Sequence, residues 1–255
     1  MLQTSLHSKE EAMMDKRYER QMIIPEIDQE GQRRLAEASV LVVGAGGLGS
    51  PALLYLAAAG VGRLGVADDD VVSASNLNRQ ILYTPDDLGR SKARQAADRL
   101  RVLNPAVEVI PYEMRVLPTT GCDLIRQYDL VIEASDNLPT KDLINALCVQ
   151  ADVPLVWGAV QRFEGQMSVT LPGHACRRCI FPTTPEPGSY PTPAELGVLG
   201  PTAGVIGTLQ AMEAIKLLLS IGEPLVDRLL LWDGMRQTFD VIHVEKNPTC
   251  PVCGD

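Results

Sequence analysis

Residues 41–50 read Leu-Val-Val-Gly-Ala-Gly-Gly-Leu-Gly-Ser, and this stretch decides the fold. A run rich in β-branched residues stops at the glycine cluster, and an apolar stretch typical of a helix, residues 51–59, follows at once. In such a strand–turn–helix, the first glycine turns the chain, the second lets the backbone approach a phosphate, and the last allows close helix packing. The helix N-terminus then directs free N–H groups at the anion. The stretch therefore predicts a nucleotide-binding loop made by Gly44, Gly46, Gly47 and Gly49.

A second predicted strand, residues 62–68, ends in three acids, Asp68, Asp69 and Asp70. Asp68 lies 24 residues after Gly44, which is about where this fold places a carboxylate that accepts hydrogen bonds from ribose hydroxyls. A simple turn after a strand is the alternative, but three acids beside a phosphate loop favour ligand hydroxyls or a metal ion. We assign Asp68 to the ribose and keep Asp70 as a further nucleotide-binding candidate.

The rest of the chain alternates between strand and helix patterns. We predict further strands over residues 107–112, 130–134 and 154–158, helices over residues 27–38, 92–103, 140–150 and 202–219, and an antiparallel extension over residues 166–171, 228–232 and 238–243. This pattern predicts an α/β, Rossmann-like fold with a mainly parallel central sheet and an antiparallel extension. We expect one domain over residues 17–255, preceded by a polar, mobile leader over residues 1–16.

Two cations and one acid fall on the edge of the sheet that carries the glycine loop. Arg79 belongs to a polar stretch, and Lys92 opens a helix, where a cation is unfavourable against the helix dipole unless an anion offsets it. Together they would neutralise a polyphosphate. Asp136 follows the fourth strand on the same edge, and a carboxylate opposite cations suits a magnesium ion that bridges phosphates. Ordinary surface cations remain the alternative for each of Arg79 and Lys92 alone.

Four of the six cysteines form two C-x-x-C pairs, Cys176 with Cys179 and Cys250 with Cys253. A redox dithiol would need one pair, whereas two pairs supply a closed tetrahedral zinc site with no position left for water. We therefore predict a structural zinc site with four cysteine ligands that pins the end of the chain to its middle. The other two, Cys122 and Cys148, read as small buried apolar residues.

Composition limits the classes of partner and location. The formal net charge is −9 and no Lys/Arg stripe occurs, which argues against a nucleic-acid surface. We find no apolar run approaching the roughly 18 residues needed to cross a bilayer and no signal-peptide core, so we expect no membrane partner and a cytoplasmic location. The stretch 181–197 carries five prolines and predicts a long surface loop.

With these residues assembled, the chain resembles the HesA/MoeB/ThiF family, the bacterial relatives of ubiquitin-activating enzymes. The resemblance covers residues 17–255. It rests on the motifs Arg-Tyr-Glu-Arg-Gln at 17–21, the glycine loop with Ser50-Pro51, Asp-Asp-Asp-Val-Val at 68–72, Ser-Asn-Leu-Asn-Arg-Gln at 75–80, residues 89–93, Ala-Ser-Asp-Asn at 134–137, Gly158, Gly165-Gln166 and both cysteine pairs.

The resemblance implies an enzyme that uses Mg-ATP to adenylate the C-terminal Gly-Gly carboxylate of a ubiquitin-like sulfur carrier protein and releases pyrophosphate. Carried over to matching positions, Asp68 holds the ribose, Asn76, Arg79 and Lys92 bind the triphosphate, and Gln80 is a further nucleotide-binding residue. Asp136 positions magnesium. The family is homodimeric, so Arg20 is expected to reach the phosphates of the partner subunit. A solvated helix start is the alternative interpretation of residues 17–21.

One departure from the family concerns the loop that precedes Gly197. Many relatives carry a cysteine there that can link covalently to the activated partner, but this chain has Pro193 at the comparable position and no cysteine between residues 180 and 200. We therefore expect adenylation alone, without a loop thioester. If a thiocarboxylate is formed, a separate sulfur donor would deliver the sulfur.

Two other functions compete with this interpretation. An NAD-dependent oxidoreductase would explain the glycine motif and Asp68, but it gives no joint role to Arg79, Lys92 and Asp136. A silent subunit that binds a ubiquitin-like protein without activating it should have lost those charged residues, and all are present.

Overall fold

The computed structural model describes residues 16–183 and 193–254. The predicted leader, residues 1–16, lies outside the described residues except for Lys16, and most of the proline-rich stretch, residues 184–192, also lies outside them. At the end of that stretch the structure has a short helix, α8 (Pro193–Leu196), which the sequence pattern did not predict.

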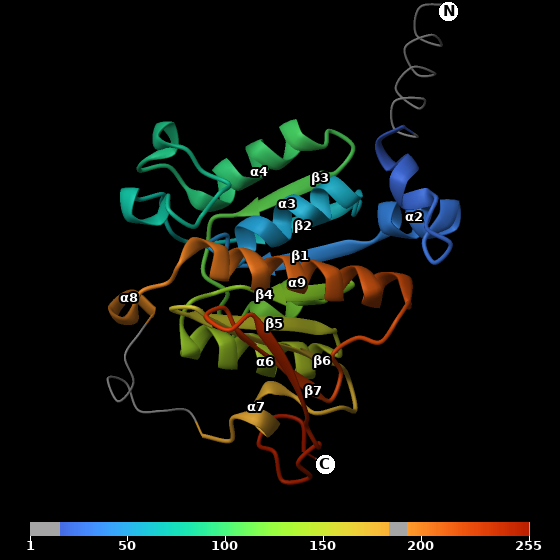
Figure 1. The fold of residues 1–255 in the computed structure, drawn as a ribbon, viewed down its shortest axis with the longest axis vertical. Coiled ribbons are helices and arrows are strands. Elements are labelled where there is room, and N and C mark those ends of the chain that lie inside the picture. The colour runs from blue at the N-terminus through green and yellow to red at the C-terminus, as the bar shows by residue number, and fades with distance from the viewer. Residues whose placement is uncertain (1–15, 184–192, 255) are drawn as a thin grey trace, which may run out of the picture.

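One eight-stranded sheet runs through the described chain in the order β3-β2-β1-β4-β5-β6-β7-β8 (Figure 1). The first five strands in that order are parallel, and β6, β7 and β8 are antiparallel, which confirms the predicted fold class. The strands are β1 (Ser39–Val43), β2 (Arg63–Ala67), β3 (Glu108–Tyr112), β4 (Leu130–Glu133), β5 (Leu155–Gln161), β6 (Glu164–Thr170), β7 (Arg228–Asp233) and β8 (Thr238–His243).

Helices cover both faces of the sheet, and each face has its own apolar core. On one side lie α2 (Asp28–Glu37), α3 (Gly49–Ala59), α4 (Lys92–Leu103) and α9 (Gly200–Leu219), and on the other α5 (Gly121–Ile125), α6 (Leu138–Ala151) and α7 (Arg177–Ile180). Strand β1 is buried throughout because Val40 and Val42 enter one core while Leu41 and Val43 enter the other. Such period-2 alternation between two apolar faces is typical of a central parallel strand.

Helix α9 is long and apolar enough to cross a membrane by length and composition alone, contrary to the expectation that no run approaches that length. Half of its most apolar window is buried inside the fold, and the helix packs against α3, β5 and β6. It also carries a buried glutamate, Glu213, paired with Lys216. These features are those of a core helix.

Candidate functional site

The candidate site lies at the carboxyl ends of β1, β2 and β4, where the glycine loop joins β1 to α3. Gly44 has φ +95°, and a Cβ there would stand 2.8 Å from the backbone of Ala134. A Cβ on Gly49 would stand 1.9 Å from the carbonyl oxygen of Gly44. Both positions therefore require glycine, and the loop packs directly on the segment that follows β4.

Two residues of the polar stretch after β2 line the glycine loop. A Cβ on Gly47 would lie 3.5 Å from the Arg79 side chain, and one on Gly46 would lie 3.5 Å from Nε2 of Gln80. Gln80 is 5% exposed, and its Oε1 has no hydrogen-bond partner among the described residues. A buried amide oxygen without a partner is costly, so it marks a place where a polar ligand or water can bind.

Asp68, just beyond the end of β2, holds the glycine loop directly. Its Oδ2 accepts a hydrogen bond from the backbone N–H of Ala45 at 2.8 Å, and its Oδ1 accepts one from the N–H of Asp70 at 2.9 Å. Burial raises the pKa of the Asp68 carboxyl, and these two N–H groups and the nearby Lys92 ammonium oppose that rise. The carboxylate retains acceptor capacity for ligand hydroxyls.

Lys92 begins α4 and is almost fully buried, with its ammonium 2.9 Å from Oδ2 of the exposed Asp70. A neighbour that the sequence analysis missed, Tyr83, donates its hydroxyl to the carbonyl oxygen of Ala45 at 2.8 Å, and this hydroxyl also lies 3.2 Å from the carbonyl oxygen of Lys92. Tyr83 thus joins the glycine loop to α4. Its position in an irregular segment gave no periodic signal by which to find it.

Arg79 is half-buried and folds back over its own turn. Its Nη1 donates to the carbonyl oxygen of Ser75 and to Oδ1 of Asn78, both at 3.0 Å. Asn76 ends the 3-10 turn η1 (Ala74–Asn76) and is also half-buried. Among the described residues, the hydrogen bonds of Arg79 go to neutral groups, which leaves its positive charge available to bind an anion.

Asp136 is exposed in the loop between β4 and α6. The same loop contains Ala134, on which Gly44 packs, so the structure brings Asp136 to the edge occupied by the glycine loop. Beneath it lies a buried ion pair between Glu133 and Lys141, with 2.6 Å between Oε2 and Nζ. The sequence offered one sign of this pair, an acid at the end of an otherwise apolar strand.

Arg20 is the predicted site residue that the structure does not bring to this edge. It is exposed on a helix over residues 16–22, which docks on the far ends of α3 and α4. The Tyr18 ring occupies the space beside Gly60, and Nδ2 of Asn104 donates to the Tyr18 hydroxyl at 2.7 Å. The length of α3, about 16 Å for its 11 residues, separates this helix from the glycine loop, and Figure 1 shows the N-terminal segment at the end of α3 away from β1's connection to it.

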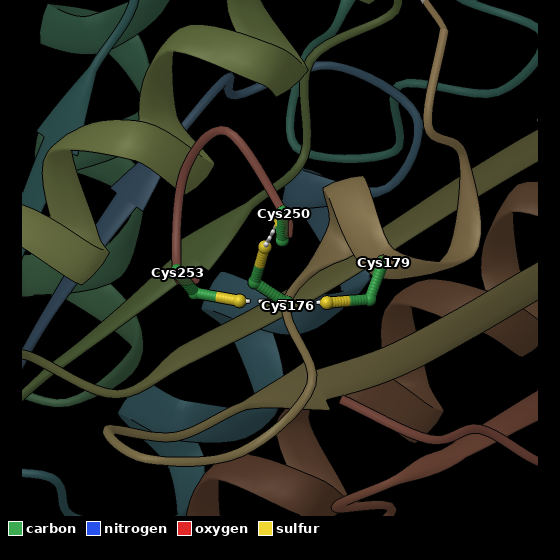
Figure 2. A group of neighbouring side chains, drawn as sticks. All are labelled: Cys176, Cys179, Cys250 and Cys253. Atoms are coloured by element: carbon green, nitrogen blue, oxygen red, sulfur yellow. Dashed lines mark hydrogen bonds between the residues drawn. The ribbon is translucent and has the colours of Figure 1, made fainter. Parts of the chain in front are cut away.

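The four paired cysteines converge at the end of the chain (Figure 2). Their sulfur atoms all lie within 4.8 Å of one another, with 3.7 Å between Cys176 and Cys250 and 3.4 Å between Cys179 and Cys253. Hydrogen bonds from the N–H groups of Cys253 and Val252 and from neighbouring thiols lower the pKa of Cys250, whereas burial raises the pKa of Cys176 and of Cys253. This cluster can hold a metal ion. Of the remaining cysteines, Cys148 is buried as predicted and Cys122 is half-buried.

Comparison with known proteins identifies the family of the chain. The family model described as ThiF matches residues 18–252. The chain is 51% identical to the sulfur carrier protein adenylyltransferase of Thermus thermophilus, over 94% of this chain and 90% of that protein. It is 50% identical to the SAMP-activating enzyme E1 of Haloferax volcanii, over 94% and 88%. It is also 48% identical to the bovine adenylyltransferase and sulfurtransferase MOCS3, but spans 53% of that protein.

Solved structures share the fold at lower identity. The chain superposes on E. coli MccB crystallised with ATP with a TM-score of 0.75 and 22% identity, covering 88% of this chain and 68% of that one. It superposes on PaaA with a TM-score of 0.76 and 21% identity, covering 92% and 75%. The family match over nearly the whole chain and the identity to relatives of similar length lead to one conclusion: this chain belongs to the ThiF family.

Proposed function

We propose that this protein is an ATP-dependent adenylyltransferase that activates the C-terminal Gly-Gly carboxylate of a ubiquitin-like sulfur carrier protein. The observation that carries the proposal is the identity of about one half, along nearly the full length of both chains, to an enzyme named for that reaction. The geometry supports it, because Asp68, Lys92 and the Asp136 loop surround one glycine loop.

The proposed reaction needs little from the protein beyond alignment and charge neutralisation. An oxygen of the carrier's C-terminal carboxylate forms a bond to the α-phosphorus of ATP, the bond from that phosphorus to the bridging oxygen breaks, and pyrophosphate leaves with the electron pair. The nucleophile is already an anion, so no general base is required. Catalysis consists of holding the two reactants in line and offsetting the charge that develops on pyrophosphate.

We assign the binding roles to the residues at the sheet edge. Asp68 would accept hydrogen bonds from the ribose hydroxyls, and the glycine loop with the N-terminus of α3 would receive the phosphates. Asn76, Arg79, Gln80 and Lys92 would bind the triphosphate, with Arg79 and Lys92 opposing the developing charge. Asp136 is the carboxylate that would hold Mg²⁺, which would supply positive charge to the phosphates, and Asp70 remains a further nucleotide-binding candidate.

We propose that the enzyme works as a homodimer in which Arg20 acts on the partner subunit's nucleotide. Anchoring at the far ends of α3 and α4 supports this, because it holds Arg20 away from the glycine loop of its own chain. The outward side of the α3–α9 layer offers a contact face. Apolar side chains on these two helices are exposed at Tyr55 and Met212 and half-buried at Leu54 and Leu209, and exposed apolar side chains on packed helices are typical of a subunit interface.

We assign the cysteine cluster to structural zinc. A tetrahedral ion with metal–sulfur bonds near 2.3 Å places its sulfur ligands about 3.8 Å apart, close to the 3.7 and 3.4 Å separations observed. Four thiolates leave no open position for substrate, so the ion would tie the segment of Cys250 and Cys253 to α7 without taking part in the reaction.

Replacing Cys250 with serine should remove the zinc and destabilise the protein. Because metal binding contributes to folding free energy, we expect the melting temperature to fall by roughly 10 °C, with zinc content per chain, measured by atomic emission, falling to near zero. Cys122→Ser is the matched control and should retain its zinc. An unchanged zinc content in Cys250→Ser would remove the assignment of zinc to the four cysteines.

The partner and the sulfur source follow from the same proposal. We propose that the partner is a sulfur carrier protein that ends in Gly-Gly, and that Pro193, in place of a cysteine, leaves the adenylate as the product of this chain. A separate protein would then donate sulfur to that adenylate. A cytoplasmic location and the absence of a nucleic-acid or membrane partner remain predictions from the sequence.

The test of the proposed function is ATP–pyrophosphate exchange with candidate sulfur carrier proteins added one at a time. We expect exchange that depends on one carrier and disappears when its final Gly-Gly is deleted. ATP binding without exchange for any carrier would favour the silent binding subunit. A melting temperature raised by NAD but not by Mg-ATP would instead favour the oxidoreductase, since a ligand stabilises the native state it binds.

A further inference from the structure

A buried ion pair, Glu133 with Lys141, lies directly behind the Asp136 loop and has no part in the reaction described above. Glu133 ends β4 with a relative exposure of 0%, and Lys141 in the first turns of α6 has 4%. Its Nζ lies 2.6 Å from Oε2 of Glu133 and donates to the carbonyl oxygen of Gly158 in β5, also at 2.6 Å. The pair therefore joins β4, β5 and α6 at one point.

The other carboxylate oxygen of Glu133 reaches forward to the loop. Its Oε1 accepts hydrogen bonds from the N–H of Ser135, at 2.8 Å, and from the Ser135 hydroxyl. Behind the strand, Nε2 of Gln210 in α9 donates to the carbonyl oxygen of Glu133 at 2.8 Å. One residue thus fixes the strand end, the start of α6 and the first part of the loop.

The far side of the same loop is also fixed. Oδ1 of Asn137 accepts a hydrogen bond from the N–H of Thr140 at 2.9 Å and so caps α6. Between these two anchors, the Asp136 carboxylate makes no hydrogen bond or ion pair with the residues that the structure describes. Its position is therefore set by its neighbours.

Stability alone gives little reason for such a pair. Two charges removed from water lose much of their hydration, and well-packed apolar residues of similar volume are often equally stable or more so. Buried polar groups that hold a metal-binding side chain in position serve a function, because the contacts that support a metal ligand influence the affinity of the site for the metal ion.

We infer that Glu133 and Lys141 are positioning residues, which hold the loop so that the Asp136 carboxylate meets the magnesium ion of bound ATP. The inference rests on the proposed function in so far as Asp136 is taken as the magnesium ligand. Glu133 and Lys141 themselves touch neither substrate nor metal and act through the backbone of the loop.

The experiment compares two glutamate–lysine pairs in the same protein, one in which both side chains are buried and one in which the glutamate is buried and the lysine is half-buried. The double variant Glu133→Gln/Lys141→Met removes both charges behind the loop and keeps the side-chain sizes. The control, Glu213→Gln/Lys216→Met, removes the α9 pair, whose glutamate also accepts a backbone N–H (from Leu225) and whose lysine also donates to a carbonyl. That control pair lies about 15 Å along α9 from Ala203, which borders Gly47.

The main readout is the Mg²⁺ concentration that gives half the maximal exchange rate at saturating ATP and carrier. We expect it to rise about tenfold or more in the Glu133→Gln/Lys141→Met variant, as for lost supporting contacts of a metal ligand, and to stay unchanged in the control. The variant Glu133→Asp/Lys141→Arg, which rebuilds the pair with different lengths, should recover part of the loss. An unchanged Mg²⁺ requirement, or an equal rise in the control, overturns the inference.

A second readout separates positioning from general damage. In an Asp136→Asn background, removing the Glu133–Lys141 pair should cause no further loss of exchange, because the residue it positions is already gone. A full additional loss would show that the pair acts by another route and would overturn the inference.

A third readout does not depend on exchange. The rise in melting temperature caused by ATP is measured with and without Mg²⁺, and the Mg²⁺-dependent part should vanish in Asp136→Asn and in Glu133→Gln/Lys141→Met but persist in the control. Its retention in the double variant, or its absence in the unmodified protein, overturns the inference. Absent exchange with an intact Mg²⁺-dependent shift would overturn the proposed function alone.

Discussion

Replacing Asp136 with alanine is expected to lower the rate of ATP–pyrophosphate exchange by about a thousandfold or more, with the fold left intact. The carboxylate is exposed and bonds to no other described residue, so its removal leaves no buried group unpaired and costs little stability. Its charge, however, is proposed to hold the magnesium ion that offsets the phosphates. Loss of that ion would remove both charge neutralisation and alignment of the α-phosphorus.

The measurement is exchange at saturating carrier, together with the melting temperature and the far-ultraviolet circular dichroism of each variant. Asp98→Ala is the control, because Asp98 is an exposed acid on α4 paired with Arg101 at 2.9 Å, away from the glycine loop. It should keep the exchange rate of the unmodified protein. If the Asp136→Ala protein retains its exchange activity, the proposed role of Asp136 in binding magnesium is ruled out.

The second large effect concerns Arg20. Arg20→Ala should lose most of the exchange activity, and mixing it with Asp136→Ala should restore activity although each variant alone has almost none. In a symmetric dimer that exchanges subunits freely, half of the dimers become hybrids. Each hybrid then has one site with an intact Asp136 and an intact Arg20 from the partner. The expected recovery is about a quarter of the unmodified activity.

The alternative outcome is equally definite. If Arg20 acted on the nucleotide of its own chain, every site in a hybrid would lack one of the two residues and mixing would restore nothing.

Met212→Glu provides the test of the contact face, because a charge placed on the exposed apolar side of α9 should shift the protein from dimer to monomer in light scattering. The monomeric variant should also lack ATP–pyrophosphate exchange activity.

Local patterns determined much of the fold. The sequence alone predicted strand β1, the glycine loop and α3. Gly44 and Gly49 occupy positions where a Cβ would meet backbone atoms, and only glycine satisfies that local constraint. Asp68 was found for a similar reason, since its place at the end of β2 fixes its distance along the chain from the loop. The cysteine pairs carried their own spacing signal, and the cluster that they form agrees with it.

Contacts between distant segments could not be read in this way. The sequence gives no spacing rule that joins Tyr83 to Ala45, or that sets Tyr18 against Gly60 and so holds Arg20 far from its own glycine loop. The apolar length of α9 also failed to indicate its place, because a core helix and a membrane span pass the same test of composition.

What the sequence by itself determined is therefore the family and the fold class, and the residues of the proposed site remain its prediction. Only the tertiary structure decided that Glu133 and Lys141 pair behind the Asp136 loop, and that the helix carrying Arg20 is anchored at the far ends of α3 and α4 from the glycine loop. The physical reason is one of range. Backbone conformation and side-chain periodicity are set by neighbours along the chain, whereas the pairing of buried charges depends on which strands and helices exclude water together.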